Sequence, residues 1–297
     1  MRIVSLTPSA SEIVFELGLG SRLVGISHEC NYPKEIDIIE KVSSSSIDPT
    51  GSQGEIDHQV RETLQSNATL YQINTERLNE LKPDFIITQG ICDVCSISSN
   101  QIEVELKGTL CTLPASTKII SLNGRTFDGI CDDIITLGNE LNSMNQAKSH
   151  VDQARNKKDY LQRQTKYDYP ILCLEWIDPY FSAGHWVPEQ IELAGFKSAI
   201  GKTGDQSRVL TVDEIIDSDP FAIALICCGY NGEQNSFFSK QLFEDDRINH
   251  LKVFQENKVY SFDADSYFSR PTTRTVSYTH LRAHETGRNL VCRLLLE

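Results

Sequence analysis

Several cysteine and histidine side chains have the chemistry to hold a metal ion or to exchange electrons. Cys92 and Cys95 form a C-x-x-C pair, and other candidates are His28, Cys30, His185, Cys227 and Cys228. A zinc site needs four such ligands, and a redox dithiol normally begins a helix of a thioredoxin-like unit. The set therefore permits a metal or heme-iron site. The alternative is inert buried thiols, which we favour for Cys111, Cys131 and Cys173.

Carboxylates and large aromatic side chains gather in the stretch LEWIDPYFSAGHWVPE, residues 174–189. Glu175 and Glu189 have the chemistry of an acid/base pair, although such carboxylates equally accept hydrogen bonds from the amides of a ligand. The chain contains no G-x-S-x-G, P-loop or G-x-G-x-x-G motif. We therefore expect a binding protein and keep an enzyme as a third alternative.

The same stretch holds both tryptophans of the chain, Trp176 and Trp186, together with Tyr180. Aromatic walls with few polar groups are typical of a pocket for a large, flat, partly apolar ligand. The alternative is that the tryptophans are ordinary core residues. The flanking Asp178-Pro179 and Gly184-His185 favour a surface loop, because connecting segments run over the surface.

Buried strands are predicted directly before these side chains. The apolar runs predict strands at residues 3–6, 23–27, 85–88, 171–174, 222–226 and 259–262. In open α/β sheets, ligands bind beyond the carboxyl ends of the strands. We therefore expect the ligand to be bound by the residues that follow the strands, namely Pro8, His28, Glu29, Cys30, Gln89, Glu175, Trp176, Tyr180, His185, Trp186, Tyr230 and Tyr267.

The chain reads as two related α/β lobes. Residues 74–92 and 211–229 share one plan, in which a cap-like Asn or Thr precedes a short helix, a proline ends it and an apolar strand follows. Between the halves lies a segment without Gly or Pro that predicts one long helix. We expect two Rossmann-like lobes with parallel central sheets, residues 1–142 and 169–274, joined by a helix at 143–168, with a ligand cleft between them. Residues 43–59 are predicted to be a polar loop.

The net charge of -13 argues against binding to nucleic acid or to anionic lipid, both of which require a basic surface. No apolar run is long enough to span a bilayer. The chain as written begins with a strand and shows no export signal, which predicts a cytoplasmic protein, and nine cysteines agree with a reducing compartment. An incomplete N-terminus would instead permit a periplasmic or cell-surface protein.

The C-terminal residues 275–297 do not resemble the rest of the chain. One permitted back-translation of TVSYTHLRAHET resembles a transposase-based sequencing adapter, and NLVCRLLLE fits the far end of that adapter in the same frame. We therefore expect a non-native tail and set it aside for function. The alternative is a genuine C-terminal helix.

Six segments together resemble one family, the substrate-binding proteins of cobalamin and iron-siderophore ABC importers, in its cobalamin-type branch. The segments are RIVSLTPSASEI, GISHECNYP, LKPDFIITQ, CDVC, EWIDPYFSAGHWVPE and YFSRP, and the resemblance covers residues 1–274. The family fold has two α/β lobes bridged by one long helix. The chain departs from exported members, which carry a signal peptide or a lipid-anchor cysteine.

The resemblance implies capture of a cobalamin-like corrinoid as ligand, without covalent chemistry and with no cofactor required. By analogy, the ring would contact Trp176, Tyr180, Trp186, Tyr230 and Tyr267. An acidic residue on each lobe would meet an ABC permease, and Glu103 and Glu233 are the candidates, with ordinary surface glutamates as the alternative. We expect a monomer. The rival function is a metal-, heme- or siderophore-iron-binding protein using Cys92, Cys95, Cys227 and Cys228, with His28 or His185 linked to cobalt or iron.

Overall fold

The computed structural model describes residues 1–66, 68–91, 113–114 and 116–277. The chain forms two compact units. Unit 1 contains Met1–Gly124 and Asp128–Val151, and unit 2 contains Arg125–Phe127 and the chain from Asp152 onward. The expected cleft between the lobes stays a prediction.

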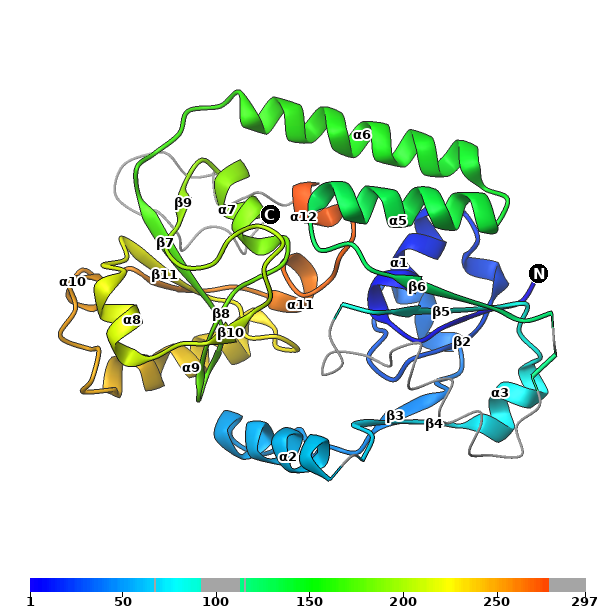
Figure 1. Ribbon diagram of the computed structural model, residues 1–297, viewed down its shortest axis with the longest axis horizontal. Helices are drawn as coiled ribbons and strands as arrows, with labels where there is room; N and C mark the ends of the chain where they lie inside the picture. The colour runs from blue at the N-terminus through cyan, green and yellow to red at the C-terminus, as the bar shows by residue number, and fades with distance from the viewer. Residues whose placement is uncertain (67, 92–112, 115, 278–297) are drawn as a thin grey trace. The chain divides into compact units, whose positions relative to one another are not determined.

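Unit 1 is built on a four-stranded parallel sheet with the strand order β2-β1-β5-β6. Its strands are β1 (Ile3–Ser5), β2 (Leu23–Ile26), β5 (Phe85–Gln89) and β6 (Lys118–Leu122). Val4 and Ile86 are fully buried, as expected of central strands covered on both faces. The helices of this unit include α1 (Pro8–Glu16), α3 (Thr75–Leu81) and most of α5 (Phe127–Glu140), with 3-10 turns at Gly20–Arg22 and Lys34–Ile38 (Figure 1).

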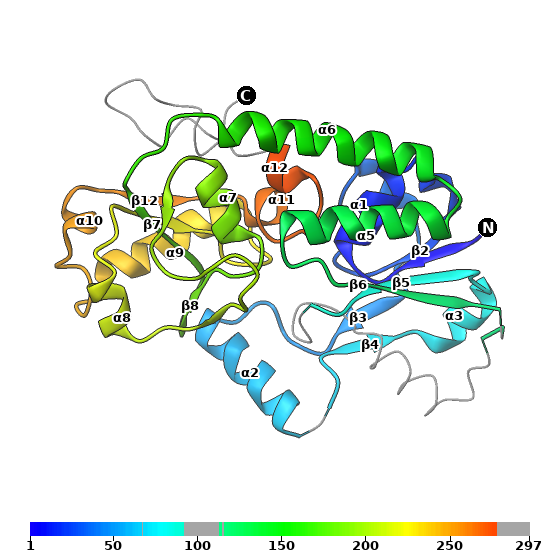
Figure 2. The same ribbon diagram turned by 45° about the horizontal axis from the view of Figure 1, so that its top comes forward.

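The predicted polar loop at residues 43–59 is wrong, because this segment forms a strand and the start of a helix. Strand β3 (Ser43–Ser45) pairs antiparallel with β4 (Tyr71–Ile73), and α2 (Gln53–Gln65) lies between them in the chain. Figures 1 and 2 show α2 at the end of this β3–β4 ribbon, away from the four-stranded sheet. Ser52 and Glu55 form a capping box at the start of α2. The S-Q-G-E spacing was therefore a readable helix signal within a polar segment.

Unit 2 is built on a six-stranded sheet with the order β10-β8-β7-β11-β12, in which β9 also pairs with β7. The strands are β7 (Pro170–Ile177), β8 (Tyr180–Ser182), β9 (Lys197–Ser198), β10 (Arg208–Val209), β11 (Ala222–Leu225) and β12 (Val259–Ser261). Strands β9, β7, β11 and β12 run parallel, whereas β8 and β10 form an antiparallel edge. The parallel sheet was predicted, and the antiparallel edge was not.

The helices of unit 2 surround this sheet. They are α7 (Val187–Leu193), α8 (Val212–Asp217), α9 (Gly232–Glu244), α10 (Lys252–Gln255), α11 (Ala264–Tyr267) and α12 (Arg274–Ser277). The core of the unit combines the fully buried Leu172, Leu174 and Ile223 of the strands with Leu242 of α9. Burial of these side chains removes apolar area from water and stabilises the unit.

The two repeated segments fold as their sequences predict. The side chains of Asn74 and Thr211 cap α3 and α8 by accepting hydrogen bonds from the backbone N–H groups of Arg77 and Glu214. Both helices end before Pro83 and Pro220, and the buried strands β5 and β11 follow. Each helix is therefore followed by a strand that has a neighbouring strand on both sides in its sheet.

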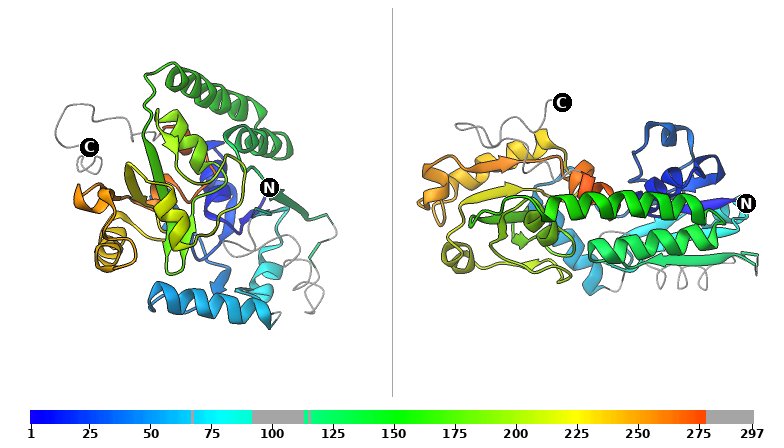
Figure 3. Two further views of the ribbon diagram at one scale, coloured as in Figure 1. Left: turned by 60° about the vertical axis from the view of Figure 1, so that its left-hand side comes forward. Right: turned by 90° about the horizontal axis from the view of Figure 1, so that it is seen from above.

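The predicted long helix is α6 (Met144–Gln162), a continuous helix in Figure 3. Its residues up to Val151 belong to unit 1, and those from Asp152 belong to unit 2. The first three residues of the predicted non-native tail belong to α12, where Thr275 is buried and its carbonyl accepts a hydrogen bond from Gln190 of α7. The remaining residues, 278–297, lie outside the described part of the chain, so the tail stays a prediction.

Candidate ligand-binding site

The first part of the aromatic stretch, up to Ser182, is a β-hairpin and not the loop that was expected, whereas Gly184-His185 do lie in a loop before α7. Strand β7 pairs in parallel with β11 only as far as Leu174 and continues to Ile177 through antiparallel pairing with β8, in which Trp176 lies opposite Phe181. Glu175 lies at an irregularity in this pairing. The expectation that residues after 174 leave the strand is wrong, because β8 offers a second partner. Glu175 and Trp176 nevertheless lie past the end of the parallel sheet.

Glu175 is held by neighbouring groups of unit 2. Its carboxylate accepts a hydrogen bond from the Ser207 hydroxyl at 2.5 Å and from the backbone N–H of Gly184 at 3.4 Å. A side chain at position 184 would meet the backbone N of Ser207 at 2.4 Å, so glycine permits this close approach. Glu175 therefore ties the hairpin to the segment before β10.

Trp176 and Tyr230 form an aromatic pair near the carboxyl ends of β7 and β11. Their ring centroids lie 5.7 Å apart at 38°, and Tyr230 also packs edge-on against Phe238 of α9 at 4.8 Å. Both Trp176 and Tyr230 are partly buried and pack on the core of unit 2. The Trp176 indole N–H donates to the carbonyl of Asp178. The pair therefore keeps accessible ring surface in a fixed orientation.

Tyr180 and Trp186, two other predicted ring contacts, are buried within unit 2. The Tyr180 hydroxyl donates a short hydrogen bond to Asp245, whose carboxylate also pairs with Arg247. The Trp186 indole N–H donates to the carbonyl of Phe268 at 2.8 Å. Both polar atoms thus have partners inside the unit, which favours a packing role for these two side chains.

His185 precedes α7 in a conformation that non-glycine residues rarely adopt, with φ at 55°. Its N–H donates to Asp205 and its carbonyl accepts from Gly204, so the loop holds it on both sides. Burial, and then the positive charge of Arg125, lower the pKa of this imidazole. Among the described residues, its buried Nε2 has no hydrogen-bond partner. The strained backbone is typical of a position that the surrounding structure determines.

Asn235 of α9, which was not among the predicted site residues, positions the loop that carries Tyr230. Its side-chain oxygen accepts the backbone N–H of Cys227 at 3.1 Å, and its amide nitrogen donates to the carbonyl of Phe262 at 2.9 Å. The fully buried Asn235 thus links the chain beyond the ends of β11 and β12. The sequence shows only that Asn235 lies four residues after Asn231, the residue that caps α9, and this spacing does not indicate a role.

Glu189 and Tyr267 also have interactions within unit 2. The Glu189 carboxylate accepts the backbone N–H of Phe127 at 2.9 Å and pairs with Lys158 at 2.8 Å. Lys158 lies 4.6 Å from the centroid of the Phe127 ring. The carbonyl of the partly buried Tyr267 accepts a hydrogen bond from Gln190 of α7. These contacts give Glu189 a structural role and place Tyr267 beside α7.

His28 follows β2 in unit 1 and is fixed by two neighbours. Its Nδ1 lies 2.9 Å from the Ser43 hydroxyl, whose oxygen also accepts the His28 backbone N–H at 3.2 Å. The ring lies 5.6 Å from that of Tyr71 on β4. Burial, and then the charge of Lys41, lower the pKa of His28 and favour the neutral imidazole. The β3–β4 ribbon thus orients this side chain.

The remaining candidates of unit 1 surround the carboxyl ends of β1, β2 and β5. Pro8 begins α1, and the hydroxyl of Thr7 donates a long hydrogen bond, 3.4 Å, to the buried Gln89. Cys30 is buried, with its sulfur 3.2 Å from the Ser11 hydroxyl, whereas Glu29 is exposed. Gln89 and Cys30 therefore serve packing, and Glu29 remains accessible.

Within the described residues, no group of three or more His, Cys, Asp and Glu side chains is arranged to hold a metal ion. Cys227 is buried and its neighbour Cys228 is exposed. Burial raises the pKa of the Cys173 thiol, which is typical of an inert sulfur. Cys92, Cys95 and Glu103 lie outside the described residues.

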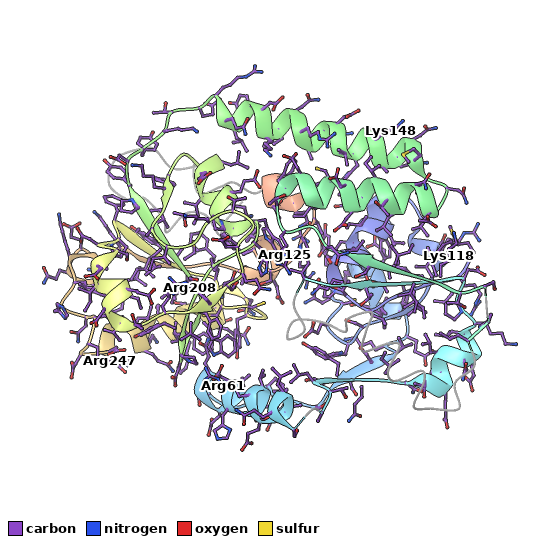
Figure 4. The ribbon with its side chains drawn as sticks, viewed as in Figure 1. Arg61, Lys118, Arg125, Lys148, Arg208 and Arg247 are labelled. Carbon is purple, nitrogen blue, oxygen red and sulfur yellow. The ribbon has the colours of Figure 1, made fainter. Side chains whose placement is uncertain are left out.

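Several basic side chains pair with carboxylates of their own unit. Figure 4 labels Arg61 on α2, Lys118 on β6, Arg208 on β10 and Arg247 after α9. Their partners are Asp57, Glu140, Glu214 and Asp245. Because acidic residues outnumber basic ones, the electrostatic potential of the surface is expected to be negative. No helix in the part of the chain that the structure describes has the length and apolar character needed to cross a membrane.

Comparison with known proteins gives a consistent result over most of the chain. The model of the family described as periplasmic binding protein matches residues 3–266. The vitamin B12-binding protein of Vibrio parahaemolyticus serotype O3:K6 is 22% identical over 293 residues, which cover 93% of this chain and 86% of the relative. Two solved structures share the fold with 17% identity each. An ABC transporter substrate-binding protein from Listeria monocytogenes EGD-e has a TM-score of 0.69 and covers 94% of this chain and 95% of its own. The S. aureus protein IsdE complexed with heme has a TM-score of 0.68 and covers 93% and 95%.

Proposed function

Because the chain belongs to the periplasmic binding protein family, we propose that it captures a cobalamin-like corrinoid and delivers it to an ABC permease. The family is one of binding proteins, so the expectation that the chain is not an enzyme follows from the same membership. The corrinoid is the cargo and not a cofactor.

The observation that carries this proposal is the Trp176–Tyr230 pair, whose partly accessible rings lie where the parallel strands of unit 2 end. Carboxyl ends of parallel strands are the usual ligand-binding edge of α/β sheets. Aromatic faces suit a broad, flat, partly apolar ring system, and their fixed orientation lowers the entropy lost on binding. The similarity to a vitamin B12-binding protein over 93% of the chain supports the corrinoid as this ring system.

Unit 1 supplies a second set of contacts in the proposal. His28 and Glu29 follow β2, and the exposed Tyr32 lies beyond them in the same segment. Glu29 would accept hydrogen bonds from the amide side chains that a corrin carries on its rim. Pro8, at the start of α1 beyond β1, would add an apolar contact, and the buried Gln89 at the end of β5 would support this surface from below the side chains.

Heme is the second candidate ligand. It shares the flat, metal-centred ring, and IsdE, which has the same fold, is a protein complexed with heme. His28, with its pKa lowered, would suit iron as well as cobalt, since imidazole is a common axial ligand. The two ligands therefore have to be separated by a binding measurement.

The permease contact would use exposed acidic side chains. Glu233 lies in the first turn of α9 and is exposed, which leaves its carboxylate available to a basic partner. Glu103 is the corresponding candidate in the first half of the chain. We propose a monomer that works on the outer side of the cytoplasmic membrane, where an importer receives its cargo.

The test is a pair of titrations of the purified chain with cyanocobalamin and with hemin. Tryptophan fluorescence and the absorption bands of each ligand are followed, and each bound ligand is challenged with an excess of the other. Saturable binding of cyanocobalamin at micromolar or tighter affinity, not displaced by hemin, is the expected outcome. Preferential binding of hemin would replace the corrinoid by heme, and binding of neither would remove both.

A further inference from the structure

We infer that the Nε2 atom of His28 coordinates the cobalt of the bound corrinoid by displacing an exchangeable water molecule from the metal. The inference rests on the proposed function and deepens it. The imidazole lone pair forms the cobalt–nitrogen bond, the water leaves with its own electron pair, and the oxidation state of cobalt is unchanged. His28 would then distinguish corrinoids with a labile axial ligand from those whose ligand is held firmly.

The environment of His28 resembles that of a metal-binding histidine. Such residues usually bond through one ring nitrogen while a neighbouring group fixes the other. Here the Ser43 hydroxyl lies 2.9 Å from Nδ1, and its oxygen also accepts the backbone N–H of His28. The Tyr71 ring, 5.6 Å away, supports one side of the imidazole. Two elements, the segment after β2 and the β3–β4 ribbon, thus hold one ring orientation.

The second nitrogen of the ring is left for the ligand. The described residues form no hydrogen bond to Nε2, and the nearby charges are the Glu29 carboxylate at 4.0 Å and the ammonium of Lys41, which donates to the His28 carbonyl at 2.9 Å. The side chain keeps 24% of its surface exposed, so the atom is reachable without unfolding the unit. Cobalt(III) in an aquocorrinoid carries net positive charge, and Glu29 would stabilise that charge close to the bond.

His185 is the other histidine predicted as a possible ligand of cobalt or iron, but its surroundings suit coordination less well. Its Nε2 is buried, and its backbone is tied to Gly204 and Asp205 by two hydrogen bonds. Arg125 adds a positive charge to its surroundings. A positive charge lies near each imidazole, Arg125 near His185 and Lys41 near His28, so the partly exposed and oriented nitrogen is what favours His28.

The first experiment compares aquocobalamin, whose water exchanges, with cyanocobalamin, whose cyanide does not. The full chain should shift the absorption bands of aquocobalamin and bind it about tenfold or more tightly than cyanocobalamin. His28→Ala and His28→Gln should abolish the band shift and reduce the affinity for aquocobalamin to that for cyanocobalamin. His58→Ala, which removes an exposed imidazole of α2, should change neither. Thermal unfolding of each variant confirms that it is folded.

A second measurement identifies the coordinating atom directly. Cobinamide lacks the nucleotide base, so nitrogen coupling in the electron paramagnetic resonance spectrum of its cobalt(II) form must come from the protein. A triplet splitting that becomes a doublet when the protein contains ¹⁵N-histidine, and that disappears in His28→Gln, is the expected result.

The outcomes separate the two proposals. Equal binding of both cobalamins with no band shift and no effect of His28→Ala would overturn the coordination and leave corrinoid capture intact. A shift that persists in His28→Gln but is lost in His185→Ala would also overturn the assignment to His28. Failure of every corrinoid to bind would overturn the proposed function, and the coordination with it.

Discussion

The rings of Trp176 and Tyr230 lie 5.7 Å apart at an interplanar angle of 38°, near the ends of the adjacent strands β7 and β11. The pair is partly buried, and Phe238 supports Tyr230 from α9. Strands β7 and β11 pair in parallel up to Leu174 and Leu225, and the chain beyond them, held by Asn235 in the case of Tyr230, brings the two rings together.

Trp176→Ala should weaken cyanocobalamin binding about tenfold or more, since truncation of one aromatic anchor costs on the order of 1–2 kcal/mol. The dissociation constant from isothermal titration calorimetry measures the effect. Tyr160→Ala removes an exposed aromatic ring of α6 and should leave the affinity unchanged. An unchanged affinity in Trp176→Ala would exclude the pair as the ring-binding surface.

Tyr180→Phe should lower the free energy of unfolding by about 1–2 kcal/mol, because the buried hydroxyl loses its hydrogen bond to Asp245. Asp245 retains Arg247 as a partner, which limits the loss. Urea unfolding with an unchanged slope measures it. The affinity for the corrinoid should stay the same. A fall in affinity without a loss of stability would show instead that the Tyr180 hydroxyl contacts the ligand.

Asn235→Ala should affect both stability and binding. It leaves the Cys227 N–H and the Phe262 carbonyl without their buried partner, which costs about 2–3 kcal/mol. The loop that carries Tyr230 then loses its anchor, so the affinity for cyanocobalamin should fall as well. Asn231→Ala, which removes only the helix cap at the start of α9, provides the matched comparison. Equal effects of the two changes on binding would contradict a positioning role for Asn235.

The ion pair between His150 of α6 and Glu16 of α1 should make the stability of the protein depend on pH. The two side chains meet at 2.9 Å, and the hydrogen bond to Glu16 is the main cause that raises the pKa of His150 above 6.5. A histidine with a raised folded-state pKa stabilises fully below its unfolded pKa, and the stabilisation is lost as the pH rises through the folded pKa.

The difference in unfolding free energy between the unsubstituted chain and His150→Gln should therefore shrink between pH 6 and pH 8.5. The change is at most about 1 kcal/mol, because both side chains keep contact with water. Urea unfolding at the two pH values measures it, and His58→Gln on α2 serves as the control. A difference in unfolding free energy that grows as the pH rises would contradict a raised pKa of His150 in the folded protein.

Much of the fold could be predicted because local signals agree with the packing. The caps at Asn74 and Thr211, the prolines that follow and the continuous apolar runs located α3, α8, β5 and β11 within a few residues. The long helix α6 was visible as a polar segment free of Gly and Pro. In each case neighbouring residues carried the information.

The features that escaped prediction depend on residues far apart in the chain. Trp176 stays in a strand because β8 pairs with it, and a strand ending at 174 looked equally good from the apolar run alone. The burial of Trp186 depends on the carbonyl of Phe268, 82 residues away. The role of Asn235 depends on Phe262. Sequence patterns identify candidate side chains, but such distant partners decide which of them remain accessible.

The measurement that tests the central claim most directly is isothermal titration of the purified chain with cyanocobalamin. Capture of a corrinoid predicts a single saturable transition with one ligand per chain, a micromolar or tighter dissociation constant and a negative heat-capacity change from burial of the ring. Folded protein that gives no heat beyond dilution at micromolar to millimolar cyanocobalamin would contradict the claim.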